Sequence, residues 1–205
     1  MNPYTSLSKN DTICAMSTPP GISAIAVIRL SGPRSVSIAG SFFKSPKANT
    51  IVDDFATHTA HFGFFATDSE VIDEVVLTVF KAPHSYTGDD IVEISCHGSE
   101  YVQQRILEVL IDGGARMARE GEFTLRAFLN GRMDLSQAEA VADLISSRSK
   151  VAHDLALSQM RGGFSQRIRD MRSQLLDLAS LLELELDFSE EDVEFADRSK
   201  LKNLM

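Results

Sequence analysis

Cysteine is scarce in this sequence of 205 residues, which contains only Cys14 and Cys96. Two cysteines cannot build the disulfide framework of a small secreted domain, so we expect a cytoplasmic protein. The segment from Met1 to Asn10 is polar and lacks the basic start and apolar run of a signal peptide. Long apolar runs are also missing, whereas a membrane-spanning helix needs roughly 20 consecutive apolar residues. We therefore expect no membrane span.

Two signatures of nucleotide-binding proteins are absent as well. The sequence has neither G-x-x-x-x-G-K-[ST], whose backbone cradles phosphates, nor the G-x-G-x-x-G of a Rossmann turn. We expect this chain alone to bind no nucleotide through either loop. A zinc site is also unexpected, because Cys96-His97 has no second pair of ligands at the required spacing.

Basic charge does not dominate, and the net charge is −9. Residues 1–115 carry 7 basic and 13 acidic side chains (−6), residues 116–172 carry 10 and 7 (+3), and residues 173–205 carry 3 and 9 (−6). A broad nucleic-acid surface needs an excess of Lys and Arg, because phosphate contacts supply most of the affinity. Any RNA contact is therefore expected to rest on a small patch within 116–172, or on residues outside the chain.

What the sequence does contain is typical of a soluble globular protein, with 43% hydrophobic and 24% charged residues. Its length suits one domain and part of a second. Short apolar runs separated by turn-forming residues predict a sheet with packed helices in the first half. Strands are predicted at 12–15, 24–30, 58–65, 74–80, 91–95 and 115–118, and helices at 31–43 and 101–111.

Several details follow from these patterns. The nearly continuous apolar run at 24–30 predicts a strand covered on both faces. Pro33 is expected in the first turn of the following helix. A polar turn between 58–65 and 74–80 predicts a hairpin, and residues 44–56 are expected to form a loop.

From residue 119 onward the pattern is helical. A short helix is predicted at Glu122–Leu129, ended by Asn130-Gly131. Ser136 and Glu139 have the spacing of a capping box, and the apolar pattern after them predicts one helix reaching Met160.

A further long helix is predicted after Gly162-Gly163, because apolar residues recur every three or four positions from Phe164 to Leu186. The acidic stretch 187–197 is expected to be a linker. A helical pattern at 198–205 stops without a cap, so we expect the helical part to be incomplete.

Charged residues within apolar strands are the first candidates for a site. Arg29 ends an apolar run and is expected either at the sheet edge in water or aimed at an anionic group above the sheet. Glu93 lies between Val92 and Ile94, so it either faces water or is paired, because an unpaired buried carboxylate is costly. Between the helices, a polar turn presents Arg132, and that turn could equally be a solvated corner.

Four stretches of sequence resemble one known family. They read DTICAMSTPPG at 11–21 with AIAVIRLSG at 24–32, SYTGDDIVEISCHG at 85–98, GEFTLRAFLNG at 121–131, and DLSQAEAVADLI at 134–145. LDFSEEDVEF at 186–195 extends the match. The order and the motifs resemble those of the N-terminal part of the bacterial and organellar tRNA-modification GTPases (MnmE/TrmE).

This resemblance implies an α+β fold followed by helices. Residues 1–118 would form a mixed β-sheet domain with packed helices, folate-binding and aminomethyltransferase-like, that also dimerises. A connecting helix and turn at 119–134 would complete the folate site, and 135–205 would begin a helical domain. The GTPase domain with its GTP, Mg and K, and the family's C-terminal catalytic cysteine, would lie beyond Met205, so the chain alone is expected to be inactive.

The resemblance also implies the ligand and its contacts. A donor of the 5-formyl-tetrahydrofolate type, or 5,10-methylenetetrahydrofolate, would be held by Arg29, Glu93 and Arg132, the last standing where the family commonly has lysine. No catalytic residue and no metal ligand is expected in this chain. In the complete enzyme, folate would supply carbon for carboxymethylaminomethylation of the wobble uridine (U34) of tRNA. The implied partners are a second copy through the N-terminal domain, an FAD-dependent tRNA-modification protein, and tRNA.

Two alternatives stay open at this point. One is a free-standing folate-dependent aminomethyltransferase, against which the long helices after residue 136 argue. The other is a non-catalytic dimerisation module whose folate pocket is vestigial. Self-association through the N-terminal domain could share or bury the apolar strands at 58–65 and 74–80 between subunits.

Overall fold

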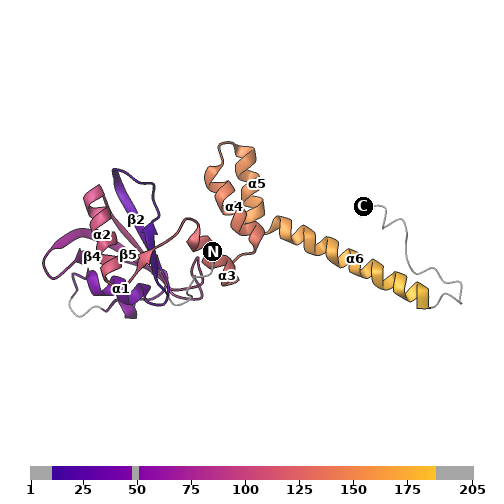
Figure 1. The fold of residues 1–205 in the computed structure, drawn as a ribbon, viewed down its shortest axis with the longest axis horizontal. Helices are drawn as coiled ribbons and strands as arrows, with labels where there is room; N and C mark the ends of the chain where they lie inside the picture. The colour runs from indigo at the N-terminus through magenta and orange to yellow at the C-terminus, as the bar shows by residue number, and fades with distance from the viewer. Residues whose placement is uncertain (1–10, 48–50, 188–205) are drawn as a thin grey trace, which may run out of the picture. The chain divides into compact units, whose positions relative to one another are not determined.

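The computed structural model describes residues 11–47 and 51–187. The chain divides into two compact units, residues 1–133 and residues 134–205, called here the sheet unit and the helical unit. Every described strand belongs to the sheet unit, and the described part of the helical unit contains helices only (Figure 1). The predicted helical pattern at 198–205 and nearly all of the predicted acidic linker lie outside the described residues.

A mixed sheet of seven strands is the centre of the sheet unit. Its strands are β1 (Ile13–Met16), β2 (Ser23–Ser31), β3 (Phe43–Lys44), β4 (Thr59–Ala66), β5 (Val71–Phe80), β6 (Ile91–Gly98) and β7 (Arg116–Met117). They lie in the order β3-β4-β5-β6-β2-β1-β7. Neighbours are antiparallel except for β1 and β7, which are parallel. The predicted hairpin is confirmed as β4 and β5.

Two helices, α1 (Ser35–Phe42) and α2 (Glu100–Asp112), cover one face of this sheet (Figure 1). The sheet unit also contains the 3-10 helix η1 (Val52–Asp54) and the short helix α3 (Glu122–Leu129). The buried core joins α1 and α2 to alternate residues of the three central strands. Those residues are Ala26, Ile28, Leu30, Val75, Leu77, Val79, Val92, Ile94 and Cys96.

The other face of the sheet is more open, and this corrects one prediction. Burial in β2 alternates from Ala26 onward, and Ile25 is 64% exposed. The prediction that β2 is covered on both faces is therefore wrong, because a strand can be apolar throughout while helices pack on one side only. We call the side without α1 and α2 the open face. Arg29 and Glu93 point to it, because they alternate with the buried residues of β2 and β6.

Two local predictions also need correction. Pro33 precedes α1, which begins at Ser35, so it does not occupy the first helical turn. The segment 44–56 is not all loop, since Lys44 pairs with Phe64 in the sheet and η1 follows at Val52–Asp54.

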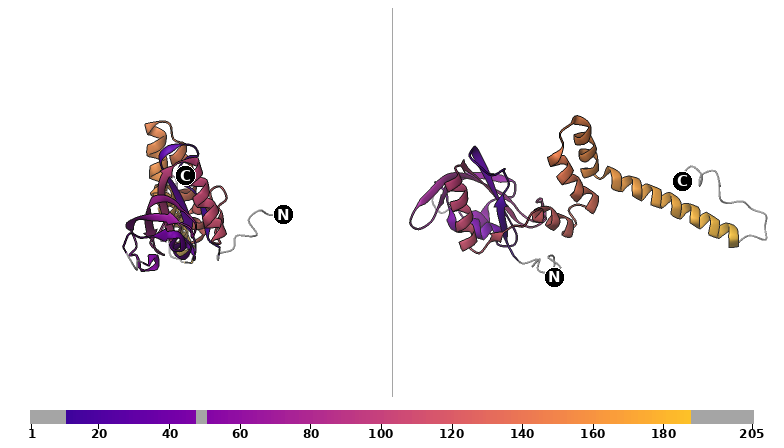
Figure 2. Two further views of the ribbon diagram at one scale, coloured as in Figure 1. Left: turned by 90° about the vertical axis from the view of Figure 1, so that its left-hand side faces the viewer. Right: turned by 45° about the horizontal axis from the view of Figure 1, so that its top comes forward.

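The helical unit begins with a pair of helices that pack side by side (Figure 2). These are α4 (Leu135–Ser146) and α5 (Lys150–Met160), followed by the long α6 (Gly163–Asp187). The prediction of one helix reaching Met160 is wrong. Serine side chains compete for backbone hydrogen bonds, and here Ser147 Oγ donates to the Leu144 carbonyl while Ser149 Oγ accepts from the Ala152 N–H. These bonds end one helix and start the next.

The capping box of α4 also differs from its prediction. Asp134 accepts the Gln137 N–H at 2.9 Å, and the Gln137 side chain accepts the Asp134 N–H at 2.9 Å. The reciprocal pair therefore lies two residues before the predicted Ser136 and Glu139. Both pairs fit the same spacing rule, and the earlier one matches the observed start of the helix. No described helix is both long enough and apolar enough to cross a membrane.

Candidate functional site

Arg29 and Glu93 are direct neighbours across β2 and β6. Arg29 Nε donates to Glu93 Oε1 at 2.8 Å, and Arg29 Nη2 lies 2.6 Å from the same oxygen. Because β2 lies between β6 and β1, the expectation that Arg29 sits at a sheet edge is wrong. The alternative that Glu93 is paired is confirmed.

This pair leaves hydrogen-bonding capacity unused. Arg29 Nε and Nη2 both meet Oε1, so within the described chain neither Glu93 Oε2 nor Arg29 Nη1 has a protein partner. The two side chains are 26% and 25% exposed, which lets a ligand reach them. The open face therefore presents a carboxylate acceptor and a guanidinium donor next to each other.

Two aromatic rings flank the Arg29 guanidinium. Its Cζ lies 5.4 Å from the centroid of the Tyr86 ring and 5.6 Å from that of Phe123. Tyr86 comes from the loop before β6, whereas Phe123 comes from α3. The two elements are joined by a 2.8 Å hydrogen bond between Tyr86 Oη and Thr124 Oγ1. At these distances the rings attract the cation and restrict its orientation.

The loop that carries Tyr86 is held by buried hydroxyl groups. Ser31 Oγ and Thr87 Oγ1 share a hydrogen bond of 2.7 Å. Ser85 Oγ accepts the Gly88 N–H at 2.9 Å and donates to the Asp89 carbonyl. Ser31, Ser85 and Thr87 are all buried. The loop is thus fixed from inside, which presents Tyr86 in a defined position.

Arg132 lies against this same loop. A Cβ added to Gly88, whose φ is +83°, would be 3.1 Å from Arg132 Cγ. Asn130 Nδ2 donates to the Thr87 carbonyl at 2.8 Å. The structure thus brings Arg29 and Glu93 together directly, whereas Arg132 is connected to them through the loop. Among the described residues, Arg132 makes no ion pair with Glu93.

Beneath α3 lies a network of ion pairs that sequence reasoning missed. The α3 network comprises Asp11, Arg116, Glu122 and Arg126. Arg116 Nη1 donates to Glu122 Oε2 at 2.9 Å and its Nε to Asp11 Oδ2 at 2.6 Å, while Arg126 Nη1 donates to the Asp11 carbonyl at 2.9 Å. Its only local sequence signal is the i, i+4 spacing of Glu122 and Arg126.

Burial and charge act in opposite directions on Glu122, whose side chain is 1% exposed. Burial alone raises the pKa of this carboxyl. Hydrogen bonds from Arg116 and from the Arg119 N–H, together with the charges of Arg116 and Arg126, outweigh it and lower the pKa from 4.5 to about 2. The same contacts raise the pKa of Arg116, led by its hydrogen bond to Glu122. Glu122 and Arg116 are therefore both charged near neutral pH.

The adjacent Cys96 and His97 lie on opposite faces of the sheet and cannot share a ligand. Cys96 is buried in the core, and burial raises the pKa of its thiol to about 11. His97 is exposed, and its Nδ1 lies 2.7 Å from Asp73 Oδ1. The part of the chain that the structure describes contains no cluster of three His, Cys, Asp or Glu side chains suited to a metal.

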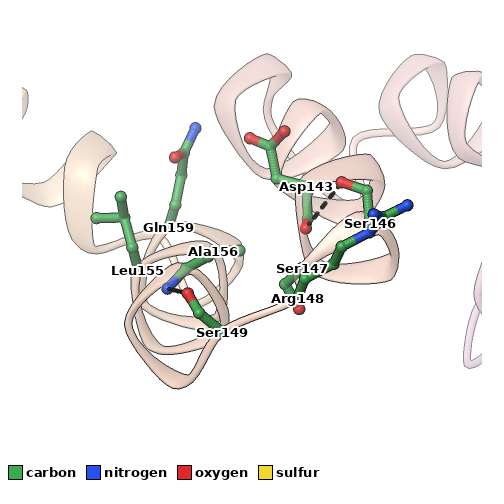
Figure 3. A pocket seen from close by; sticks show the side chains of 9 residues that line it. Asp143, Ser146, Ser147, Arg148, Ser149, Leu155, Ala156 and Gln159 are labelled. Atoms are coloured by element: carbon green, nitrogen blue, oxygen red, sulfur yellow. Dashed lines mark hydrogen bonds between the residues drawn. The ribbon is translucent and has the colours of Figure 1, made fainter.

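A cavity of about 490 Å³ lies in the helical unit where α4 and α5 meet (Figure 3). Its lining is formed by Asp143, Ser146, Ser147, Arg148, Ser149, Ala152, Leu155, Ala156 and Gln159. None of the sequence-predicted site residues contributes to it. Its serines already bond to nearby backbone groups, as shown by Ser146 Oγ with the Asp143 carbonyl and Ser149 Oγ with the Ala152 N–H. We therefore place the candidate site on the open face of the sheet.

Comparison with known proteins gives matches for both units. The family model described as "GTP-binding protein TrmE N-terminus" matches residues 12–132, and that described as "MnmE helical domain" matches residues 135–205. The chain belongs to the MnmE/TrmE family. The recognition made from the four sequence stretches is thereby confirmed, as is the fold class of a mixed-sheet domain followed by helices.

Curated MnmE relatives are similar over nearly the whole chain. The protein of Flavobacterium johnsoniae, named "tRNA modification GTPase MnmE", is 57% identical over 195 residues, which cover 95% of this chain and 42% of the relative. That of Bacteroides thetaiotaomicron, with the same name, is 57% identical over 194 residues, with 95% and 42% covered. That of Cytophaga hutchinsonii is 55% identical over 205 residues, with 100% and 44% covered. The chain thus spans less than half the length of these MnmE proteins.

Proposed function

We propose that the sheet unit binds a one-carbon donor of the 5-formyl-tetrahydrofolate type through Arg29, Glu93 and Arg132. The observation that carries this proposal is the Arg29–Glu93 pair, which is partly exposed on the open face and flanked by two aromatic rings. A flat, polar heterocycle suits such a surface, because rings and guanidinium groups stack on one another.

The chemistry of the pair fits a pterin ring. A pterin carries an N–H and an exocyclic amine side by side, and a carboxylate can accept both. Glu93 Oε2 is available for one of them, whereas Oε1 already accepts from Arg29. A two-point contact therefore requires Arg29 to release one of its two bonds. The released donors, together with Arg132, suit the anionic groups of the folate.

For the longer protein of which this chain would be part, we propose the activity named for its relatives. Those proteins are tRNA modification GTPases. The folate would supply carbon for carboxymethylaminomethylation of U34 in tRNA, with an FAD-dependent partner handling the redox step. GTP hydrolysis, with Mg and K, would require a GTPase domain that this chain lacks. We further propose a cytoplasmic protein that forms homodimers through the sheet unit.

The alternative of a free-standing aminomethyltransferase is disfavoured by one observation. Residues 135–205 match the MnmE helical domain, and a free-standing folate enzyme has no need of that unit. A non-catalytic dimerisation module is the other alternative, and ligand binding separates it from our proposal.

Calorimetric titration of 5-formyl-tetrahydrofolate into the 205-residue chain tests the proposal, and we expect saturable binding. Glu93→Gln keeps the size of the side chain but removes its charge. Losing a charge-assisted hydrogen bond costs on the order of 1.5–3 kcal/mol, which is roughly a tenfold to hundredfold loss of affinity. Arg29→Lys keeps the charge but loses the planar fork, so we expect weaker binding there as well.

Glu74→Gln is the matched control. Glu74 is exposed on β5, on the same face of the sheet as Arg29 but two strands away. Its substitution should leave the affinity unchanged. Equal affinities in the Glu93 and Arg29 variants and the unmodified chain would remove the pair from the binding site. If no form of the chain bound the folate, the dimerisation module would be favoured instead.

A further inference from the structure

The helix α3 is attached to the sheet unit in an unusual way. Its three buried residues are Glu122, Arg126 and Ala127, so two of the three are charged. Phe128 and Leu129, in contrast, are 37% and 50% exposed. An amphipathic helix ordinarily packs through an apolar stripe. Here ion pairs replace much of that stripe.

The α3 network connects three separate segments of the chain. Asp11 precedes β1, Arg116 lies in β7, and Glu122 and Arg126 lie one turn apart on α3. Two arginines balance two carboxylates, and the carboxylates accept hydrogen bonds at 2.5–3.4 Å. Each bond is directional, so the network restricts both the position of α3 and its rotation about its own axis.

The N-terminus of α3 depends on the same carboxylate. Gly121 precedes the helix with φ +70°, and no side chain caps it there. Glu122 Oε2 accepts the Arg119 N–H at 2.9 Å. The turn that starts the helix is therefore tied to the network as well.

Two side chains of α3 contact residues of the candidate site. Phe123 follows Glu122 directly and lies over the Arg29 guanidinium, and Thr124 bonds to the Tyr86 hydroxyl. A small rotation of α3 would move both side chains. Buried ion pairs often add little net stability, because desolvation offsets their attraction, but they can specify one geometry.

We propose that the α3 network is a positioning device that sets Phe123 and Thr124 against Arg29 and Tyr86. One consequence of this proposal, the effect of the network on folate affinity, rests on the proposed function. The geometry of Arg29 itself depends on the network whether or not a ligand binds.

The test reads the Arg29 environment directly. Arg29 Nε–H is held by Glu93, and Arg105 Nε–H is held in the same way by Glu70 at 2.8 Å on another part of the sheet unit. Two-dimensional ¹H–¹⁵N spectra of the arginine side chains, assigned with Arg29→Lys, can follow both protons in one sample. We expect Glu122→Gln to shift or broaden the Arg29 signal and to leave the Arg105 signal unchanged.

Glu70→Gln is the control, because it makes the same Glu-to-Gln change at the direct partner of Arg105. It should move the Arg105 signal and leave that of Arg29 in place. Calorimetry with 5-formyl-tetrahydrofolate is the second measurement. Residues coupled through one network influence one another's contacts, so we expect Glu122→Gln to weaken binding roughly threefold or more. In the Thr124→Val background the loss should be smaller, because one of the contacts that the network positions is already gone.

If Glu122→Gln does not fold, Asp11→Asn replaces it. Asp11 is 26% exposed, and its substitution leaves the bonds between Arg116 and Glu122 in place. An unchanged Arg29 signal in a folded variant of either kind would overturn the proposal. Failure of the unmodified chain to bind folate would instead count against the proposed function, and the spectra would still decide the role of the network.

Discussion

Glu122 keeps its negative charge although its side chain is almost fully enclosed. Its pKa is about 2 in the folded chain against an ordinary 4.5. A carboxyl whose pKa is lowered by folding stabilises the fold above its unfolded pKa and loses that contribution as pH falls. The stabilisation by Glu122 should therefore be complete above pH 4.5 and disappear as the pH approaches 2.

This predicts a pH-dependent cost for Glu122→Gln. Near neutral pH, removing one member of a buried ion pair costs on the order of 3 kcal/mol, because its partners stay buried and unpaired. Below pH 4.5 the difference from the unmodified chain should shrink, because Glu122 takes up a proton in the unfolded chain there, and near pH 2 in the folded chain as well. Urea unfolding followed by circular dichroism between pH 2 and 7 measures it. Glu74→Gln, at an exposed position, should show a small difference at every pH, and a constant large cost for Glu122→Gln would contradict the prediction.

Single residues also show how far sequence reasoning reaches. Arg29 and Glu93 stand out because each interrupts an apolar strand. That they bond to one another was not predictable, because they lie 64 positions apart and periodicity shows which face a residue occupies but not its neighbour across the sheet. For the same reason the contacts of the Tyr86 and Phe123 rings with Arg29 were not predicted. Arg132 stood out only as part of a polar turn that could also be a solvated corner, and its contact with the ligand was implied by the family resemblance; its role stays a prediction.

At the scale of elements, the start of α4 depends on one side chain. Asp134 forms the capping box with Gln137, and its pKa is lowered by hydrogen bonds from Ser165 and the Gln137 N–H. Replacing an N-cap Asp by Ala costs about 0.5–2 kcal/mol. We expect Asp134→Ala to destabilise the helical unit by that amount.

Asp134→Asn is the matched comparison, because asparagine caps helices about as well as aspartate. It should recover most of the loss. Thermal unfolding followed at the helical circular-dichroism band measures both variants. Equal losses for Ala and Asn would mean that the charge of Asp134 matters more than its cap.

The helices differ in how well sequence specified them. Glu122–Leu129 was predicted with its observed bounds, because a glycine precedes it and Asn130-Gly131 follows it. The long α6 was also recovered, since its apolar repeat is uninterrupted. The division between α4 and α5 was missed, because the apolar spacing continues across Ser147–Ser149 although the helical backbone is interrupted there. There, side-chain bonds of serine outweigh periodicity.

For the molecule as a whole, the open face and one strand edge are left for another surface. Phe62 of β4 and Val76 of β5 are cross-strand partners on that face, 53% and 39% exposed. The edge strand β3 pairs with β4 only at Phe64 and Phe65. The rest of that edge, from Thr59 to Gly63, has no neighbouring strand within the described residues. Exposed edges and apolar patches favour association with another chain.

These features lead to a prediction about the proposed homodimer. If the sheet unit forms it, a chain ending at Met133 should still be dimeric in light scattering, because a two-fold contact buries the same surface on both copies. The competing cause is α6, whose exposed apolar residues include Ile168 and Leu175.

In the 205-residue chain, Phe62→Asp should produce monomers by placing a charge in the contact. Ile111→Asp is the control, since Ile111 is 40% exposed on α2, a helix that covers the opposite face. The predicted interface would be refuted if the chain ending at Met133 were monomeric while the 205-residue chain stayed dimeric with and without Phe62→Asp. The contact would then belong to the helices.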